Sequence, residues 1–179
     1  MLKGKTSSPY SQLKSDRAQR LPPPPKPDIS RNSDLFQIPT RFPTAFPTNS
    51  LKAQRALMAL KQQRPEKLVE ASRALWQCYW RDQGDLASDA DLVRVLTPVL
   101  GEPAVRALLT AGVADKAIKD GLLRATQEAA ELGAFGAPWI QVTVPGKEPV
   151  CFFGSDRFEQ MAMFVGEIWV GPVPSKASL

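Results

Sequence analysis

Apolar residues recur every three or four positions between residues 49 and 132, and this spacing predicts a run of α-helices. Asn49 or Ser50 suits the N-cap of the first helix, which Arg64 and Pro65 end. Pro65 also fits the first turn of a second helix that stops before Gly84. Three further helices are predicted, over residues 88–100, 102–112 and 115–132. Ser88, with Asp91 three residues later, has the pattern of a capping box at the start of the first of these.

After Pro138 the hydrophobic period changes from helical to strand-like in two short runs. Residues 139–144 and 150–153 flank a Pro-Gly turn, which predicts an antiparallel β-hairpin. Gly133, Gly136 and Pro138 stop the preceding helix, because glycine tolerates positive φ and a residue before proline avoids the helical region. A closing helix is predicted from about Asp156 to Trp169.

The N-terminal fifty residues hold nine of the seventeen prolines and lack a helical pattern. We expect residues 1–33 to be mostly extended or disordered, as a linker more than as a ligand for SH3 or WW domains. The next segment carries four large apolar side chains and is expected to lie as an irregular strap against the helices: Phe36, Ile38, Phe42 and Phe46. Residues 34–132 would then form a helical subdomain, and residues 133–175 a hairpin with its helix.

Charge and composition exclude several classes of function. The net charge of +5 belongs to residues 1–50, since residues 51–179 carry fifteen basic and fifteen acidic side chains. This pattern predicts neither a nucleic-acid partner nor a membrane span, and the chain lacks the apolar core of a secretory signal, so an intracellular protein is expected. The chain has no histidine, which excludes histidine-based catalysis and ordinary zinc sites.

Four side chains with possible chemistry are expected to be packed. Trp76 and Trp80 lie near the apolar stripe of the second helix, and we expect both in the core. Cys78 adjoins that stripe and Cys151 lies in the hairpin. Both are predicted to be packed thiols more than nucleophiles.

Two motifs in order carry a family resemblance: "GAFGAP" at 133–138 and "FGSDR" at 153–157, followed by Trp-x-Gly-Pro at 169–172. Helix, Gly-x-Pro, hairpin and helix resembles the C-terminal half of a thioredoxin fold. Residues 35–174 resemble the kappa-class glutathione transferases of the DsbA-like superfamily, which also contains the 2-hydroxychromene-2-carboxylate isomerases. "PEKLVEASRALWQCYW" is similar to the helical domain inserted in that family. The resemblance implies an α/β, thioredoxin-like (DsbA-like) C-terminal half with an all-helical insertion.

The resemblance also implies a glutathione site at Ala137, Pro138, Ser155 and Asp156. A cis Pro138 would leave the backbone of Ala137 free to pair with the cysteinyl backbone of glutathione. Ser155 and the N-terminus of the last helix would hold a carboxylate, and Asp156 would pair with the ammonium group. The alternative is purely structural, with a trans Gly-Ala-Pro turn and Ser155 or Asp156 as N-cap, Glu159 completing a capping box.

The N-terminal half of the family pattern is not recognisable. Ser8 in "SSPYSQL" matches the catalytic serine of the family's Ser-Pro-Tyr-Ser-Trp motif, but Gln12 replaces the tryptophan and no apolar strand precedes it. The family's Asn-Lys-Pro-Pro stretch has no counterpart in "LPPPPKPD". We therefore assign no catalytic residue and expect a truncated or alternatively assembled member of the family.

Three functions follow from the resemblance. The first is a glutathione transferase that uses the glutathione thiolate on a small electrophile, without a metal and with a homodimer as the candidate assembly. The second is a glutathione-dependent isomerase of hydroxychromene carboxylates. The third is a catalytically inactive interaction module, while a disulfide oxidoreductase is disfavoured because the chain has no C-x-x-C. The compartment is left open between mitochondrion, peroxisome and cytosol.

Overall fold

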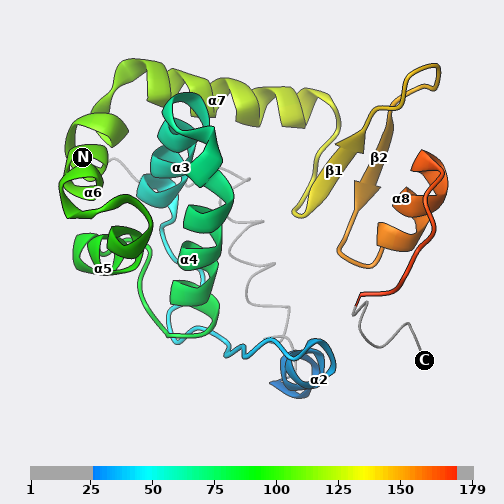
Figure 1. Cartoon of the computed structure of the whole chain (residues 1–179), viewed down its shortest axis with the longest axis horizontal. Coiled ribbons are helices and arrows are strands. Elements are labelled where there is room, and N and C mark those ends of the chain that lie inside the picture. Colours follow the sequence, from blue (N-terminus) through cyan, green and yellow to red (C-terminus); the bar gives the residue numbers. More distant parts are fainter. Residues whose placement is uncertain (1–25, 173–179) are drawn as a thin grey trace, which may run out of the picture.

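The structure of the protein, a computed structural model, describes residues 26–172, with side chains from residue 29 onward. Figure 1 shows a helical body on one side, a β-hairpin with one helix on the other, and the long helix α7 joining them. The first segment described is helix α2, Lys26–Phe36. In the part of the chain that the structure describes, no helix has the length and apolarity needed to cross a bilayer.

Five α-helices and two short turns form the helical body, and their order matches the sequence prediction. They are α3 (Leu51–Gln63), a 3-10 turn (Pro65–Lys67), α4 (Leu68–Trp80), α5 (Asp89–Leu100), α6 (Glu102–Ala107), a π-helical turn (Leu108–Gly112) and α7 (Lys116–Glu131). The predicted cap of α5 is present, since the hydroxyl of Ser88 accepts a hydrogen bond from the backbone N–H of Asp91 at 3.3 Å. The side-chain oxygen of Asn49 accepts from the N–H of Leu51 at 3.1 Å at the start of α3.

The core of the described chain sits almost wholly among these helices. Its largest fully buried side chains come from the inward stripes of α4, α5, α6 and α7: Leu92, Leu96, Ile118, Val105 and Cys78. Alanines on α3 let the neighbouring helices approach closely, with Ala56 and Ala59 completely inaccessible to solvent. Burying such apolar surface contributes about 25 cal/mol per Å², so the helical body holds most of the stabilising contacts.

The strap predicted between residues 36 and 50 is confirmed in its second half. Phe42 and Phe46 form an aromatic cluster with Trp80, with ring centroids 5.1 to 6.2 Å apart. The hydroxyl of Tyr79 donates to the carbonyl of Ala45 at 2.8 Å, which fixes the strap to α4. Ile38 is 58% exposed and Phe46 is 57% exposed, so these two side chains are less covered than predicted, and Phe36 belongs to α2 instead of the strap.

Residues 26–33 differ from the extended chain predicted for 1–33, because they belong to α2. Proline is tolerated in the first turn of a helix, where its missing N–H has no intrahelical acceptor. Residues 28–36 contain neither proline nor glycine, so nothing interrupts the helix once it starts. The predictions for residues 1–25, including Ser8 and the proline tract from Pro22, lie outside the described residues.

Two packing predictions are wrong. Trp76 is 62% exposed. The inward side of α4 is formed by Ala71, Leu75 and Cys78, and the side chain of Trp76 lies on the solvent side of the helix. Cys151 is exposed, since it lies on the face of its strand opposite buried Phe152. Trp80 is half-buried within the aromatic cluster, and Cys78 is buried as predicted.

The predicted hairpin is present as β1 (Trp139–Val142) and β2 (Val150–Phe153), paired antiparallel with Trp139 opposite Phe153. Helix α8 (Phe158–Val165) packs on one face of the hairpin, where the rings of Phe164 and Phe152 are 6.1 Å apart. The helix is shorter than predicted, because Gly166 takes a left-handed conformation with φ of 84° and ends it. Within the described residues, β1 has β2 as its one neighbour, so its other edge is free.

Candidate glutathione site

Ala137 and Pro138 lie where α7 ends and β1 begins, and both are exposed. The peptide bond between them is cis. The loop before them turns at Gly133, which has a φ of 88°. Gly136 lies against the ring of Phe153, since a Cβ added there would come within 2.9 Å of that ring.

One hydrogen bond brings the two predicted motifs together. The backbone N–H of Gly154 donates to the carbonyl of Pro138 at 3.0 Å, extending the β1–β2 ladder by one pair. Ser155 and Asp156 follow Gly154 directly, so all four predicted residues lie at the same end of the hairpin. Gly154 has a φ of 103°, and a side chain added there would collide with the carboxylate of Asp156. A glycine is therefore required at this turn.

The same bond determines which backbone groups of β1 point outward. In an antiparallel pair, hydrogen-bonded and non-hydrogen-bonded residue pairs alternate. Because Pro138 and Gly154 are a hydrogen-bonded pair, Ile140 and Val142 also face β2. Trp139 and Gln141 consequently direct their N–H and C=O groups to the free edge. The backbone of Ala137 forms no hydrogen bond within the described residues, so a ligand backbone can pair there.

The polar side chains of the turn are available to a ligand. The N-cap of α8 is Arg157, without a capping hydrogen bond from a side chain. The alternative in which Ser155 or Asp156 caps this helix is therefore wrong. Asp156 is 71% exposed in its side chain and pairs with Arg157, whose Nη1 donates to its carboxylate at 2.6 Å.

Arg157 is the site residue that sequence reasoning did not single out, although it stands in the quoted "FGSDR" motif. It places a cation beside the anion of Asp156 at the open end of the hairpin. An amino acid zwitterion presents one carboxylate and one ammonium group, which complement such a pair. Ser155 adds an exposed hydroxyl. The donors and acceptors present therefore fit the γ-glutamyl end of glutathione.

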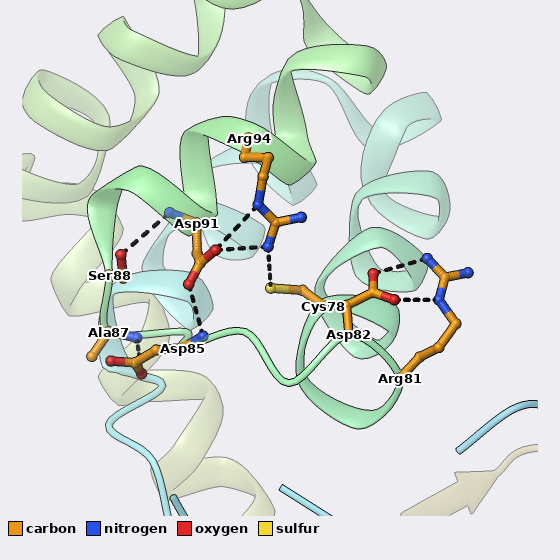
Figure 2. A network of polar contacts seen from close by, with 8 residues as sticks. All are labelled: Cys78, Arg81, Asp82, Asp85, Ala87, Ser88, Asp91 and Arg94. Atoms are coloured by element: carbon orange, nitrogen blue, oxygen red, sulfur yellow. Dashed lines mark hydrogen bonds and ion pairs between the residues drawn. The ribbon is translucent and has the colours of Figure 1, made fainter. Parts of the chain in front are cut away.

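A second polar network, shown in Figure 2, joins α4 to α5. Nη2 of Arg94 lies 3.8 Å from Sγ of Cys78 and 2.6 Å from Oδ1 of Asp91. Burial, assisted by the nearby carboxylate of Asp91, raises the pKa of the Cys78 thiol. The thiol is thus protonated near neutral pH and does not act as a nucleophile. This network holds the two helices together and makes no contact with the predicted site.

The search for a metal centre gives a negative result within the described residues. No group of three or more acidic or cysteine side chains lies together there in a way that could hold a metal ion.

The comparisons with known proteins agree with the geometry. Residues 24–166 match the model of the DSBA-like thioredoxin domain. The chain is 32% identical over 152 residues to "Glutathione S-transferase kappa 1" of Rattus norvegicus, which covers 82% of this chain and 67% of the relative. It is 35% identical over 145 residues to the Homo sapiens protein of the same name, and this match covers 78% of this chain and 63% of the relative.

A third relative, "Glutathione S-transferase kappa 1" of Caenorhabditis elegans, is 31% identical over 140 residues, covering 75% of this chain and 61% of its own length. The chain thus spans about two thirds of the length of the relatives it matches. The chain therefore belongs to the kappa-class glutathione transferase family, among the proteins with a DsbA-like thioredoxin domain.

Proposed function

We propose that the protein binds glutathione at the end of the hairpin and transfers its thiolate to an electrophile. The observation that carries this proposal is the hydrogen bond from Gly154 to Pro138. It sets an unpaired peptide group, that of Ala137, beside an exposed ion pair, that of Asp156 and Arg157. A short peptide with an amino acid zwitterion at one end matches both features.

In the proposed complex, the cysteinyl N–H and C=O of glutathione add to the free edge of β1 at Ala137, as a very short extra strand. The γ-glutamyl ammonium pairs with Asp156, and its carboxylate takes the hydroxyl of Ser155 and the guanidinium of Arg157. These contacts involve charged groups at an exposed site, so each one contributes about 1 kcal/mol. Affinity in the millimolar to micromolar range is the expected result.

The proposed reaction needs glutathione as co-substrate and no metal. The thiol loses its proton to solvent or a base, the sulfur forms a bond to the electrophilic carbon, and the leaving group departs with the electron pair of the broken bond. Ser8 stays a candidate for the group that stabilises the thiolate, and it lies outside the described residues. Replacing Ser8 by alanine tests this, since unchanged turnover would remove Ser8 from the mechanism.

The test of binding is a thermal melt with glutathione at several concentrations. A ligand that binds only the folded state stabilises it by RT ln(1 + [L]/Kd), or about 2.7 kcal/mol at one hundred times Kd. We expect the melting temperature of the wild type to rise with glutathione, and the rise to vanish in Asp156→Asn. Glu128→Gln is the matched control, because Glu128 is an exposed, unpaired carboxylate on α7. A cooperative melt that ignores glutathione would contradict the proposal.

Product analysis separates the remaining alternatives. A glutathione-dependent isomerase would convert a hydroxychromene carboxylate without consuming glutathione, whereas a transferase would form a conjugate. An inactive interaction module would bind glutathione or a protein and form neither product.

Homodimer formation and the compartment stay predictions. Several large apolar side chains exposed on and after α8 support an association surface: Met163, Val165, Ile168 and Val170. Light scattering across a concentration series tests the homodimer, and imaging of the tagged full chain decides the compartment.

A further inference from the structure

Basic side chains gather at a hollow of the helical body, away from the hairpin. Lys52 and Arg55 reach it from the first turns of α3, and Lys119 reaches it from α7, which contacts α3. The hollow has a volume of about 410 Å³ and no acidic side chain lines it. This volume is in the range of sites for small organic molecules. It shares no lining residue with the candidate glutathione site.

The positive charge in the hollow is only partly balanced. Lys52 forms an ion pair with Asp89, with 2.5 Å between Nζ and Oδ1. The side chains of Arg55 and Lys119 form no hydrogen bond or ion pair within the described residues, although Arg55 is half-buried. Most other cations of the helical body have an acidic partner on the same or a neighbouring turn, as Lys67, Arg94 and Arg106 do.

This local excess of positive charge contrasts with residues 51–179 as a whole, which carry equal numbers of basic and acidic side chains. Like charges held around one hollow repel each other, and a half-buried guanidinium has lost part of its hydration. An anion bound between Arg55 and Lys119 would relieve both costs. Two unbalanced positive charges match a dianion, and the planar fork of arginine matches phosphate oxygens.

Apart from Asn49, the other lining residues are apolar and match an apolar part of the ligand. Leu51, Val113 and Ala114 contribute side chains, and Val113 is buried. A ligand with a charged head and a small apolar body would contact both surfaces. We propose that this hollow binds a phosphate monoester with a small apolar body, with the phosphate between Arg55 and Lys119 and the body against Leu51 and Val113.

The experiment is calorimetric titration of the full chain in 150 mM sodium chloride, a salt concentration that screens unspecific attraction to surface charges. The probe is phenyl phosphate, compared with inorganic phosphate and with benzoate. We expect phenyl phosphate to bind most tightly, since inorganic phosphate lacks the apolar body and benzoate lacks the second charge. Saturating glutathione should leave the affinity for phenyl phosphate unchanged, so this proposal and the proposed function can fail separately.

Three variants connect the binding to the named side chains. Arg55→Gln and Lys119→Gln should each weaken phenyl phosphate binding about tenfold or more, because each removes a charged hydrogen bond. Arg55→Lys should give an intermediate loss, since it keeps the charge and loses the fork. The matched control is Arg73→Gln, which removes an exposed, unpaired arginine outside the hollow and should change the affinity less than twofold.

Two results would overturn the proposal. One is a wild type that does not bind phenyl phosphate at this salt concentration. The other is equal binding by wild type, Arg55→Gln and Lys119→Gln, which would mean unspecific attraction elsewhere on the surface. Lys119 is exposed, so Lys119→Gln keeps the test valid even if the half-buried Arg55 proves necessary for folding.

Discussion

The carboxylate of Asp91 serves two partners at once. Its Oδ2 accepts the backbone N–H of Asp85 at 2.9 Å, and its Oδ1 accepts hydrogen bonds from Nε and Nη2 of Arg94. The N–H of Asp85 and, after it, the guanidinium of Arg94 hold the pKa of this carboxyl below its usual value. A carboxyl whose pKa is lowered by folding stabilises the protein above its unfolded pKa and loses that contribution as the pH falls through its folded pKa.

We expect Asp91→Asn to lower the free energy of unfolding by about 1 kcal/mol at pH 7, through the loss of charged hydrogen bonds. The difference between wild type and variant should persist down to about pH 5 and shrink below about pH 4, because the unfolded chain takes up its proton there and the folded wild type takes it up only at lower pH. Urea unfolding at several pH values measures it. A difference that is constant from pH 7 to pH 3 would show that the charge of Asp91 does not stabilise the fold.

Single residues also show where sequence reasoning was sufficient. Ser88 and Asp91 were predicted as a cap from their spacing alone, because capping is a local interaction. The exposure of Trp76 could not be predicted in this way. Its position beside an apolar stripe fits either the core or the surface, and the choice depends on how α4 rotates against α5.

At the scale of elements, the hairpin has two kinds of backbone position. Ile140 faces β2 with its N–H, whereas Gln141 faces the free edge. Proline lacks the N–H, so a proline at position 140 removes a ladder hydrogen bond, whereas a proline at position 141 removes none.

We therefore expect Ile140→Pro to disrupt the hairpin and Gln141→Pro to leave it folded. Chemical shifts of the amides of β2 in an NMR spectrum measure this, with the helical body as internal reference. The opposite order of effects would mean that the register is shifted by one residue, which would turn the N–H groups of Trp139 and Gln141 toward β2 instead of toward the free edge.

The existence and order of the elements could be predicted well, because helix and strand periods differ and prolines and glycines mark the boundaries. The ends of the last helix were predicted less well. Asp156 has the composition of an N-cap, yet the turn at Gly154 delays the helix to Phe158. The hydrogen bond from Gly154 to Pro138 joins segments that are distant in the sequence. Such contacts do not change the local sequence pattern, so they could be seen only in the structure.

On the scale of the whole molecule, stability is distributed unequally. The buried core lies among α3 to α7, while the hairpin contributes Phe152 as its one buried side chain among the described residues. Two strands with one covered face are marginal without further support.

We expect amide hydrogens of α4 and α5 to exchange with solvent much more slowly than those of β1 and β2, because local opening of the hairpin breaks few apolar contacts. Hydrogen exchange followed by mass spectrometry measures this. Glutathione should slow exchange in the hairpin and leave α4 and α5 unchanged, if it binds where we propose. Equal protection of both regions would mean that the molecule opens as one unit.

The contact between Gly136 and the ring of Phe153 links two positions seventeen residues apart in the chain. The loop can lie flat on the aromatic ring only because it carries no side chain at this position. A mutational scan should accordingly find that Gly136 and Phe153 constrain each other: an alanine at 136 becomes tolerable when the residue at 153 is made smaller. The two motifs of the candidate glutathione site would then vary together among related sequences, because one residue of each motif limits the size of the other.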